Sequence, residues 1–360
     1  MQLRIPGPCP CPDEVLKATG RQMINHRGKE FGEMQGRIIP KLQQCFQTKN
    51  DVLILTASGT GGMESAVVNT LSPGDKALGI TIGIFGDRFI DIAQTYGAEV
   101  VPLKYEWGQA ANPDDVKKAL KDNPGIKAVL VTHNETSTGV TNPLGEIAAI
   151  VKDAGKLILV DAVSSLSSID LPVDKWNLDV VVTSSQKGWM APPGLAFVSI
   201  SEEGWKAHAQ ARMPRFYFDY TRAKKFIQDG QTPWTPAIPV YFGLDVALDL
   251  MLKEGLPNIF ARHARIAGKV RQWVKVKGME LLAADEKYAS NTVTAVKAPA
   301  GLDVAKFNAT LRDEYKVVIA GGQGGMKGKV FRIGHLGFVN DEDMDEVLAA
   351  MDKALEKEKK

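Results

Sequence analysis

Residues 157–166 read LILVDAVSSL, and residues 184–194 read SSQKGWMAPPG. The first is an apolar run that ends at Asp161, and the second places Lys187 in a turn of small and polar residues between two apolar runs. Short runs of this kind, rich in β-branched residues and bounded by turn residues, are typical of buried strands. We therefore predict that Asp161 and Lys187 lie at neighbouring strand ends of one sheet.

Apolar runs of the same kind recur from residue 50 to residue 200 and alternate with amphipathic segments. They cover residues 52–57, 76–81, 98–103, 126–132, 156–162, 179–184 and 194–200. Helices are expected between them, near residues 62–71, 86–97, 112–121 and 143–154. The last two begin with Asn112-Pro113 and Asn142-Pro143, in which an Asn cap precedes a proline at the first helical position. The alternation predicts an α/β fold with a mostly parallel seven-stranded sheet between helices.

The rhythm changes after residue 200. Residues 232–242, TPWTPAIPVYF, are too rich in proline for a central strand and are expected to cross the surface before a long helix. Residues 243–276 have a helical pattern interrupted at EGLPN, and short strands then alternate with helices at 303–314 and 341–356. These segments predict a smaller C-terminal α+β domain. The expected divisions are an N-terminal arm at 1–17, a large domain at 18–240 and a small domain at 241–360.

Composition favours a globular protein that binds small molecules. The chain has 360 residues, 44% of them hydrophobic, and its 44 Lys and Arg against 42 Asp and Glu give a net charge of +2. Without a basic block, neither nucleic acid nor membrane is an expected partner. The first residues lack the apolar core of a signal peptide, so we expect a cytoplasmic location. The three cysteines and five histidines show no metal-ligand spacing, and no metal is expected.

Lys187 and Asp161 together suggest a cofactor chemistry. A lysine at a strand end can form a Schiff base with an aldehyde cofactor. An aspartate at a neighbouring strand end can hold the pyridine nitrogen of that cofactor protonated. This is the pairing that pyridoxal 5′-phosphate (PLP) chemistry requires, so the sequence predicts PLP as the cofactor.

A phosphate site is expected at Thr60-Gly61-Gly62, which follows the run 52–57 and opens a helix. Glycines let backbone N–H groups approach an anion closely, and a helix N-terminus favours negative charge. The spacing matches neither a dinucleotide fingerprint nor a P-loop, so an ordinary strand-to-helix turn is the alternative.

Other residues could surround the same cofactor. Phe85, between glycines after the run 76–81, and Val163 could cover the two faces of a flat ring, although Phe85 could instead be a hydrophobic plug over a helix start. Residues 132–139, THNETSTG, are polar for a strand end and either line a site or cap a loop. Arg332 lies in an apolar run and needs a partner, either a substrate carboxylate or an internal acidic residue.

These motifs carry a resemblance to a known family. The chain resembles the class V aminotransferases of PLP fold type I, and specifically the alanine–glyoxylate, serine–pyruvate and serine–glyoxylate group. The matching runs are PGP (6–8), FQTKN, SGTGGMESAVVN, GIFGDR, THNETSTGV, LVDAVSSL, SSQKGWMAPPG, TPWTPAIP and FRIGHLG. The resemblance covers essentially the whole chain, and VDAVSSL followed by SSQK and APPG is its most specific part.

The resemblance implies a role for each matching residue. Lys187 would be the Schiff-base lysine and proton shuttle, and Asp161 would be the partner of the pyridine nitrogen. The remaining implied cofactor contacts are Gln186, Thr60, Gly61 and Gly62 at the phosphate, Phe85 on the ring, and Thr136 beside the ring hydroxyl. Arg332 would receive the substrate α-carboxylate, with the backbone of the arm at Gly7 closing the pocket.

The resemblance also implies a homodimer with shared active sites. The segment 232–235 would reach the partner's cofactor phosphate. Thr235 matches the relatives well, whereas the Thr232 position is often a tyrosine. Two further positions depart from relatives, because Phe85 replaces a tryptophan found in some of them and Gly62 replaces a histidine.

The function that follows is transfer of the amino group of alanine or serine to glyoxylate or pyruvate by a ping-pong mechanism. Small neutral substrates are expected because no second arginine is evident for a side-chain carboxylate, although Arg27 and Arg88 cannot be located from sequence. Phosphoserine, an aminophosphonate or ureidoglycine are alternative donors. A non-catalytic subunit of a larger complex, as for similar proteins associated with hydrogenases, is the alternative from a different class. A cysteine desulfurase is not expected, since no cysteine follows Cys45.

Overall fold

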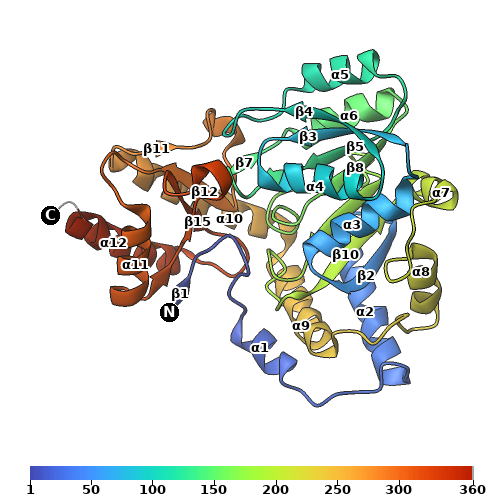
Figure 1. Ribbon diagram of the computed structural model, residues 1–360. Coiled ribbons are helices and arrows are strands. Elements are labelled where there is room, and N and C mark those ends of the chain that lie inside the picture. Colours follow the sequence, from blue (N-terminus) through green and yellow to red (C-terminus); the bar gives the residue numbers. More distant parts are fainter. Residues whose placement is uncertain (359–360) are drawn as a thin grey trace.

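The computed structural model describes residues 1–358, and its centre is a seven-stranded sheet (Figure 1). The strand order is β2-β10-β9-β8-β5-β3-β4. The strands are β2 (Asp51–Ala57), β3 (Lys76–Thr81), β4 (Glu99–Lys104), β5 (Ile126–Thr132), β8 (Leu157–Asp161), β9 (Val180–Ser184) and β10 (Gly194–Ile200). β10 is antiparallel to both of its neighbours, and the other pairs are parallel. The predicted mostly parallel seven-stranded sheet is confirmed.

Helices cover both faces of this sheet. One face packs against α2 (Lys29–Phe46), α5 (Pro113–Asp122), α6 (Leu144–Asp153) and α9 (Ile238–Glu254). The other packs against α3 (Gly59–Thr70), α4 (Ile84–Thr95), α7 (Glu202–Gln210) and α8 (Tyr220–Gln228). In β5 the side chains of Val129 and Val131 join the first core, while those of Ala128 and Leu130 join the second. Burial on both faces is why the strands appear in the sequence as continuous apolar runs.

Helix α9 begins earlier than the sequence pattern predicted. It starts at Ile238, within the proline-rich segment that was expected only to cross the surface, and Pro239 lies in its first turn. A proline is tolerated there because the first N–H groups of a helix have no intrahelical acceptor. α9 packs against α1 (Asp13–Thr19) and α2. The division into domains near residue 240 stays a proposal.

The C-terminal part has its own sheet and core. The antiparallel sheet has the order β11 (Glu280–Leu281), β12 (Val293–Lys297), β15 (Val330–Gly334) and β14 (Ala320–Gly321). It shares a core with α10 (Leu256–Val276), α11 (Val304–Glu314) and α12 (Asp341–Glu358). The short strand β13 (Val317–Val318) pairs with β1 (Gln2–Leu3), and β6 (Asn134–Glu135) pairs with β7 (Val140–Thr141). The N-terminal segment is therefore attached to the C-terminal part of the chain (Figure 1).

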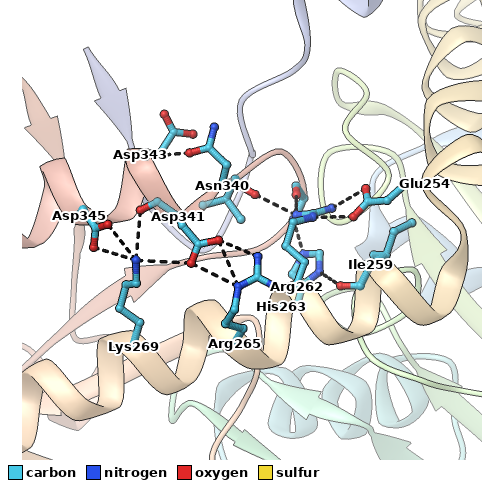
Figure 2. A network of polar contacts seen from close by, with 12 residues as sticks. Glu254, Ile259, Arg262, His263, Arg265, Lys269, Asn340, Asp341, Asp343 and Asp345 are labelled. Atoms are coloured by element: carbon cyan, nitrogen blue, oxygen red, sulfur yellow. Dashed lines mark hydrogen bonds and ion pairs between the residues drawn. The ribbon is translucent and has the colours of Figure 1, made fainter.

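A polar network on α10 holds the turn that follows β15 (Figure 2). Arg262 forms an ion pair with Glu254 and donates to the carbonyls of Gly337 and Val339. The N–H of Gly337 donates to Nε2 of His263 at 3.0 Å, so the other ring nitrogen carries the proton and donates to the carbonyl of Ile259. Burial lowers the pKa of His263 to about 3, which keeps this ring neutral.

The same turn lies close to the segment that carries Lys187. A Cβ placed on Gly337 would lie 3.1 Å from the carbonyl oxygen of Lys187. The network thus fixes the C-terminal part against the turn after β9. Within residues 1–358, every helix is too short or too polar to span a lipid bilayer. The same residues contain no group of three or more His, Cys, Asp or Glu side chains arranged to bind a metal ion.

Candidate active site

A cavity of about 250 Å³ opens where β8 and β9 end and where α3 and α4 begin. Its lining includes many of the residues predicted from sequence: Gly7, Thr60, Phe85, Asp161, Val163, Gln186 and Lys187. The carboxyl edge of an open α/β sheet is the usual position of a ligand site. The cavity therefore brings together residues from the arm, from two strand ends and from two helix N-termini.

Lys187 enters the cavity from the turn after β9 and is only 9% exposed. Its Nζ donates a hydrogen bond to the carbonyl oxygen of Pro6 in the N-terminal arm. Burial lowers the pKa of Lys187, because the protonated amine loses its hydration. A lysine with a lowered pKa has more of the neutral amine, which is the nucleophilic form.

Gly7 allows the arm to pass directly over this lysine. Its φ is 126°, a conformation that side-chain-bearing residues rarely adopt. A Cβ at this position would lie 2.6 Å from Nζ of Lys187. A glycine is thus required for the arm to close this side of the cavity.

Asp161 is the last residue of β8 and lines the same cavity as Lys187. Its Oδ1 accepts from the N–H of Val163 at 2.9 Å, and its Oδ2 accepts from the hydroxyl of Thr132 at 3.3 Å. Burial raises the pKa of Asp161 to about 6, with these hydrogen bonds opposing the rise. A buried carboxylate whose hydrogen-bond donors are all neutral is well suited to bind a cationic group of a ligand.

The first turn of α3 offers free backbone N–H groups. Its N-cap, Ser58, makes no side-chain capping bond, and among residues 1–358 no acceptor is bonded to the N–H of Thr60 or Gly61. Thr60 and Gly59 line the cavity, whereas Gly61 borders Ala57 and Phe218. Such unpaired amides at a helix N-terminus form a site for an anion.

Gly62 has a different place from the one predicted. Its N–H is bonded to the carbonyl of Ser58, and it does not line the cavity. A Cβ on Gly62 would lie 2.5 Å from Cγ1 of Val182 in β9. Gly62 therefore permits close packing of α3 on the sheet. Because its N–H is already bonded to the carbonyl of Ser58, this amide is not free for the phosphate contact predicted from sequence.

Phe85 and Val163 both line the cavity. Phe85 lies in the first turn of α4, and the guanidinium of Arg88 lies 4.7 Å from its ring centroid. A half-buried aromatic at a cavity wall is consistent with a stacking surface and not with a plug in the core. Arg88, which could not be located from sequence, lines the cavity as well.

Thr136 and Arg332 are not among the residues that line the cavity. The hydroxyl of Thr136 donates to Oγ of Ser164 at 2.9 Å, and its carbonyl accepts from Nη1 of Arg332 at 3.1 Å. Arg332 also donates to the carbonyl of Gly321 and to the side-chain oxygen of Gln323. All of these acceptors are uncharged, and Arg332 forms no ion pair within residues 1–358. Burial lowers the pKa of Arg332, and the charge of Glu135 raises it.

Thr232 and Thr235 lie apart from this cavity. They belong to the segment between α8 and α9 and are not among its lining residues. Thr232 donates its hydroxyl to the carbonyl of Trp234, and Thr235 is exposed. This chain's own cavity is therefore formed without them.

Glu135 belongs to the polar segment 132–139 that was expected to line a site, but no individual role was assigned to it from sequence. It is fully buried, its Oε2 accepts from the N–H groups of Phe85 and Gly86, and its Oε1 accepts from the N–H and hydroxyl of Ser137. Burial raises the pKa of this carboxyl, and the bonds from Ser137 and Gly86 lower it. Three of its four hydrogen bonds come from backbone N–H groups, which can only donate and therefore favour the carboxylate, and two of these bonds anchor the turn that carries Phe85.

Comparisons with known proteins agree with this geometry. The "Aminotransferase class-V" family model matches residues 13–344. A "Soluble hydrogenase, small subunit" of Synechococcus sp. is 44% identical over 98% of this chain and 92% of its own length. A serine–glyoxylate aminotransferase of Methylorubrum extorquens is 38% identical, over 98% of this chain and 90% of its own. The crystal structure of an alanine–glyoxylate aminotransferase from Nostoc sp. is 29% identical with a TM-score of 0.94, covering 98% of this chain and 94% of that chain.

Proposed function

The chain belongs to the class V aminotransferase family, and on that basis we propose that it binds PLP and transfers the amino group of alanine or serine to glyoxylate or pyruvate. One observation carries the proposal. Lys187 and Asp161, from different strand ends, line one cavity together with an aromatic side chain and the first turn of α3. A pyridine aldehyde needs an amine to form a Schiff base and a carboxylate to hold its ring nitrogen protonated, and this cavity offers both groups.

The residues of the cavity fit this cofactor. Lys187 would bond to its aldehyde carbon, Asp161 would accept a hydrogen bond from the protonated ring nitrogen, and Phe85 and Val163 would cover the ring. The amides of Thr60 and Gly61 would donate to the phosphate. Gln186 lines the cavity with an amide whose buried oxygen has no partner among residues 1–358, and the rotated amide would present its NH₂ to the phosphate.

Bound PLP supplies an electron sink for the charge that develops at the substrate α-carbon. The lowered pKa of Lys187 makes its Nζ a base for the α-proton and later the donor that returns it. Pro6 holds this amine from the side of the arm. Asp161 would keep the proton on the ring nitrogen, because its buried carboxylate forms no ion pair with another residue in 1–358.

Arg332 would receive the α-carboxylate of each substrate in turn. Its existing bonds to Thr136, Gly321 and Gln323 use Nε and Nη1, and no bond to a described residue uses Nη2. One arginine suffices because the amino acid and the 2-oxo acid both carry an α-carboxylate. A single site that serves both substrates predicts ping-pong kinetics.

The substrate class is tested with a panel of amino donors. Purified protein with PLP is assayed with alanine, serine, aspartate and glutamate against glyoxylate and pyruvate. Highest kcat/KM with alanine or serine supports the proposal. Turnover with aspartate or glutamate alone contradicts the choice of small neutral donors, and turnover confined to phosphoserine, an aminophosphonate or ureidoglycine favours those alternatives.

The name of the Synechococcus relative favours a second candidate, a non-catalytic subunit of a hydrogenase complex. Lys187, Asp161 and Arg332 argue against it, since a scaffold has no physical need for these buried charged groups. The two candidates differ in the isolated protein. PLP-dependent turnover by the purified chain supports the enzyme, whereas an isolated protein that binds no PLP supports the scaffold.

We further propose a homodimer in which Thr232 and Thr235 reach the partner's cofactor phosphate. Their position away from this chain's cavity supports the idea, as do the exposed aromatic side chains of Phe216 and Tyr217 near Trp234. Light scattering is expected to give twice the monomer mass, and a monomer would contradict the proposal. The cytoplasmic location stays a prediction from sequence.

A further inference from the structure

Arg88 connects the two helix N-termini that meet at the cavity. It lies one turn after Phe85 on α4, and its guanidinium lies 4.7 Å from the centroid of that ring. Its Nη1 donates to Oγ1 of Thr60 in the first turn of α3 at 3.1 Å. The guanidinium is thus held between the proposed ring-stacking residue and the proposed phosphate turn.

The charge of Arg88 has no acidic partner among the described residues. Its one hydrogen bond ends on the hydroxyl of Thr60, and the neighbouring Asp87 bonds instead to Thr81. The positive charge lowers the pKa of both Asp161 and Lys187, though less than other causes affect them. The guanidinium therefore acts electrostatically on the interior of the cavity.

The cofactor proposed above carries a phosphate, and none of the residues assigned to that phosphate is charged. They offer backbone amides, hydroxyls and the amide of Gln186. Lys187 and Arg88 are the cationic side chains that line the cavity within residues 1–358. Lys187 is committed to the aldehyde, so Arg88 is the cation available for the phosphate.

We propose that Arg88 binds the cofactor phosphate and supplies the positive charge that selects the phosphorylated cofactor over pyridoxal. The inference rests on the proposed PLP-dependent function. Charge-assisted bonds from arginine to phosphate oxygens are stronger than bonds from neutral donors. Occupied in this way, Arg88 is also unavailable for a substrate side-chain carboxylate, which agrees with small neutral substrates.

The test compares the dissociation constants of PLP and pyridoxal for the wild-type protein and two variants, followed by the change in cofactor absorbance. Arg88→Gln is expected to weaken PLP binding about 10- to 100-fold, the size of a hydrogen bond to a charged group, and to change pyridoxal binding about 2-fold or less. Inorganic phosphate, used as a competitor of PLP, is expected to lose affinity in the same variant. Arg88→Lys keeps the charge and is expected to recover part of the PLP affinity.

Arg21→Gln is a matched control, because Arg21 also lies over an aromatic ring, that of Phe242 at 4.5 Å, but does not line the cavity. Its affinities for PLP and pyridoxal are expected to equal those of the wild type. An equal loss of PLP and pyridoxal binding in Arg88→Gln would show that Arg88 only braces Phe85 and would overturn the inference. Unchanged PLP binding would overturn it too, whereas failure of the wild type to bind PLP would overturn the proposed function itself.

Discussion

Gly62→Ala is the substitution whose cost follows most directly from the packing of α3 on the sheet. An ideal Cβ at this position would lie 2.5 Å from Cγ1 of Val182 and 3.3 Å from Cβ of Ala196. Carbon atoms in ordinary contact lie about 3.5–4.0 Å apart, so the helix must retreat by about 1 Å or the valine must leave its rotamer. Val182 is fully buried and β-branched, hence stiff, and overpacking of this kind costs about 1–3 kcal/mol.

Gly36→Ala is the matched control for this substitution. Gly36 lies within α2, is exposed, and has no atom within 4 Å of an ideal Cβ. Replacing glycine by alanine in a helix contributes up to about 1 kcal/mol of stability in both variants, so their difference isolates the overpacking cost.

Urea unfolding of the two apo-proteins, followed by circular dichroism, measures the difference. Gly62→Ala is expected to be less stable than Gly36→Ala by about 1–3 kcal/mol. Stabilities within about 0.5 kcal/mol of each other would refute the close contact between α3 and β9. Because α3 also presents the amides of Thr60 and Gly61, Gly62→Ala is expected to weaken PLP binding as well.

Three further predictions concern charged side chains. Asp161→Asn is expected to stabilise the apo-protein at pH 7 by up to about 3 kcal/mol, because burial raises the pKa of this carboxyl from 3.8 to about 6. The unfolding free energy of the wild type should accordingly fall as the pH rises from about 4 to about 6. The same dependence of unfolding free energy on pH in Asp161→Asn, measured by urea titration, would contradict this. Glu135→Gln places an NH₂ against two donors and is expected to cost about 2–5 kcal/mol in urea unfolding, whereas the exposed Glu99→Gln should cost less than about 0.5 kcal/mol. Arg262→Met removes the ion pair and the carbonyl bonds of Figure 2 and is expected to cost about 1–3 kcal/mol, an expectation that an unchanged unfolding midpoint would refute.

The large sheet was predictable because each of its strands is buried on both faces. Runs such as VLILTA and IKAVLVT have no other simple explanation in an α/β chain. Helix starts were less accurate, since α3 begins at Gly59 and not near residue 62, and α9 begins at Ile238. Glycine and proline at these starts have low helix propensity, and their positions depend on packing that the local sequence does not reveal.

The part of the site that could be predicted is the part in which a single residue type indicates the chemistry. A lysine and an aspartate at strand ends stand out in apolar surroundings, and both line the cavity. The contacts of Arg88, Glu135 and Pro6 were not predicted, because each of these residues contacts one that is distant in the chain. Glu135 accepts from Phe85, 50 positions away, and Pro6 accepts from Lys187, 181 positions away.

The central claim is that Lys187 is the residue to which the cofactor bonds, in the cavity that Asp161 also lines. The most direct test incubates the purified protein with PLP, reduces it with borohydride and maps the labelled peptide by mass spectrometry. We expect a single pyridoxyl label on Lys187 and none in Lys187→Ala. A label on another lysine, or the same amount of label in the variant, would contradict the account.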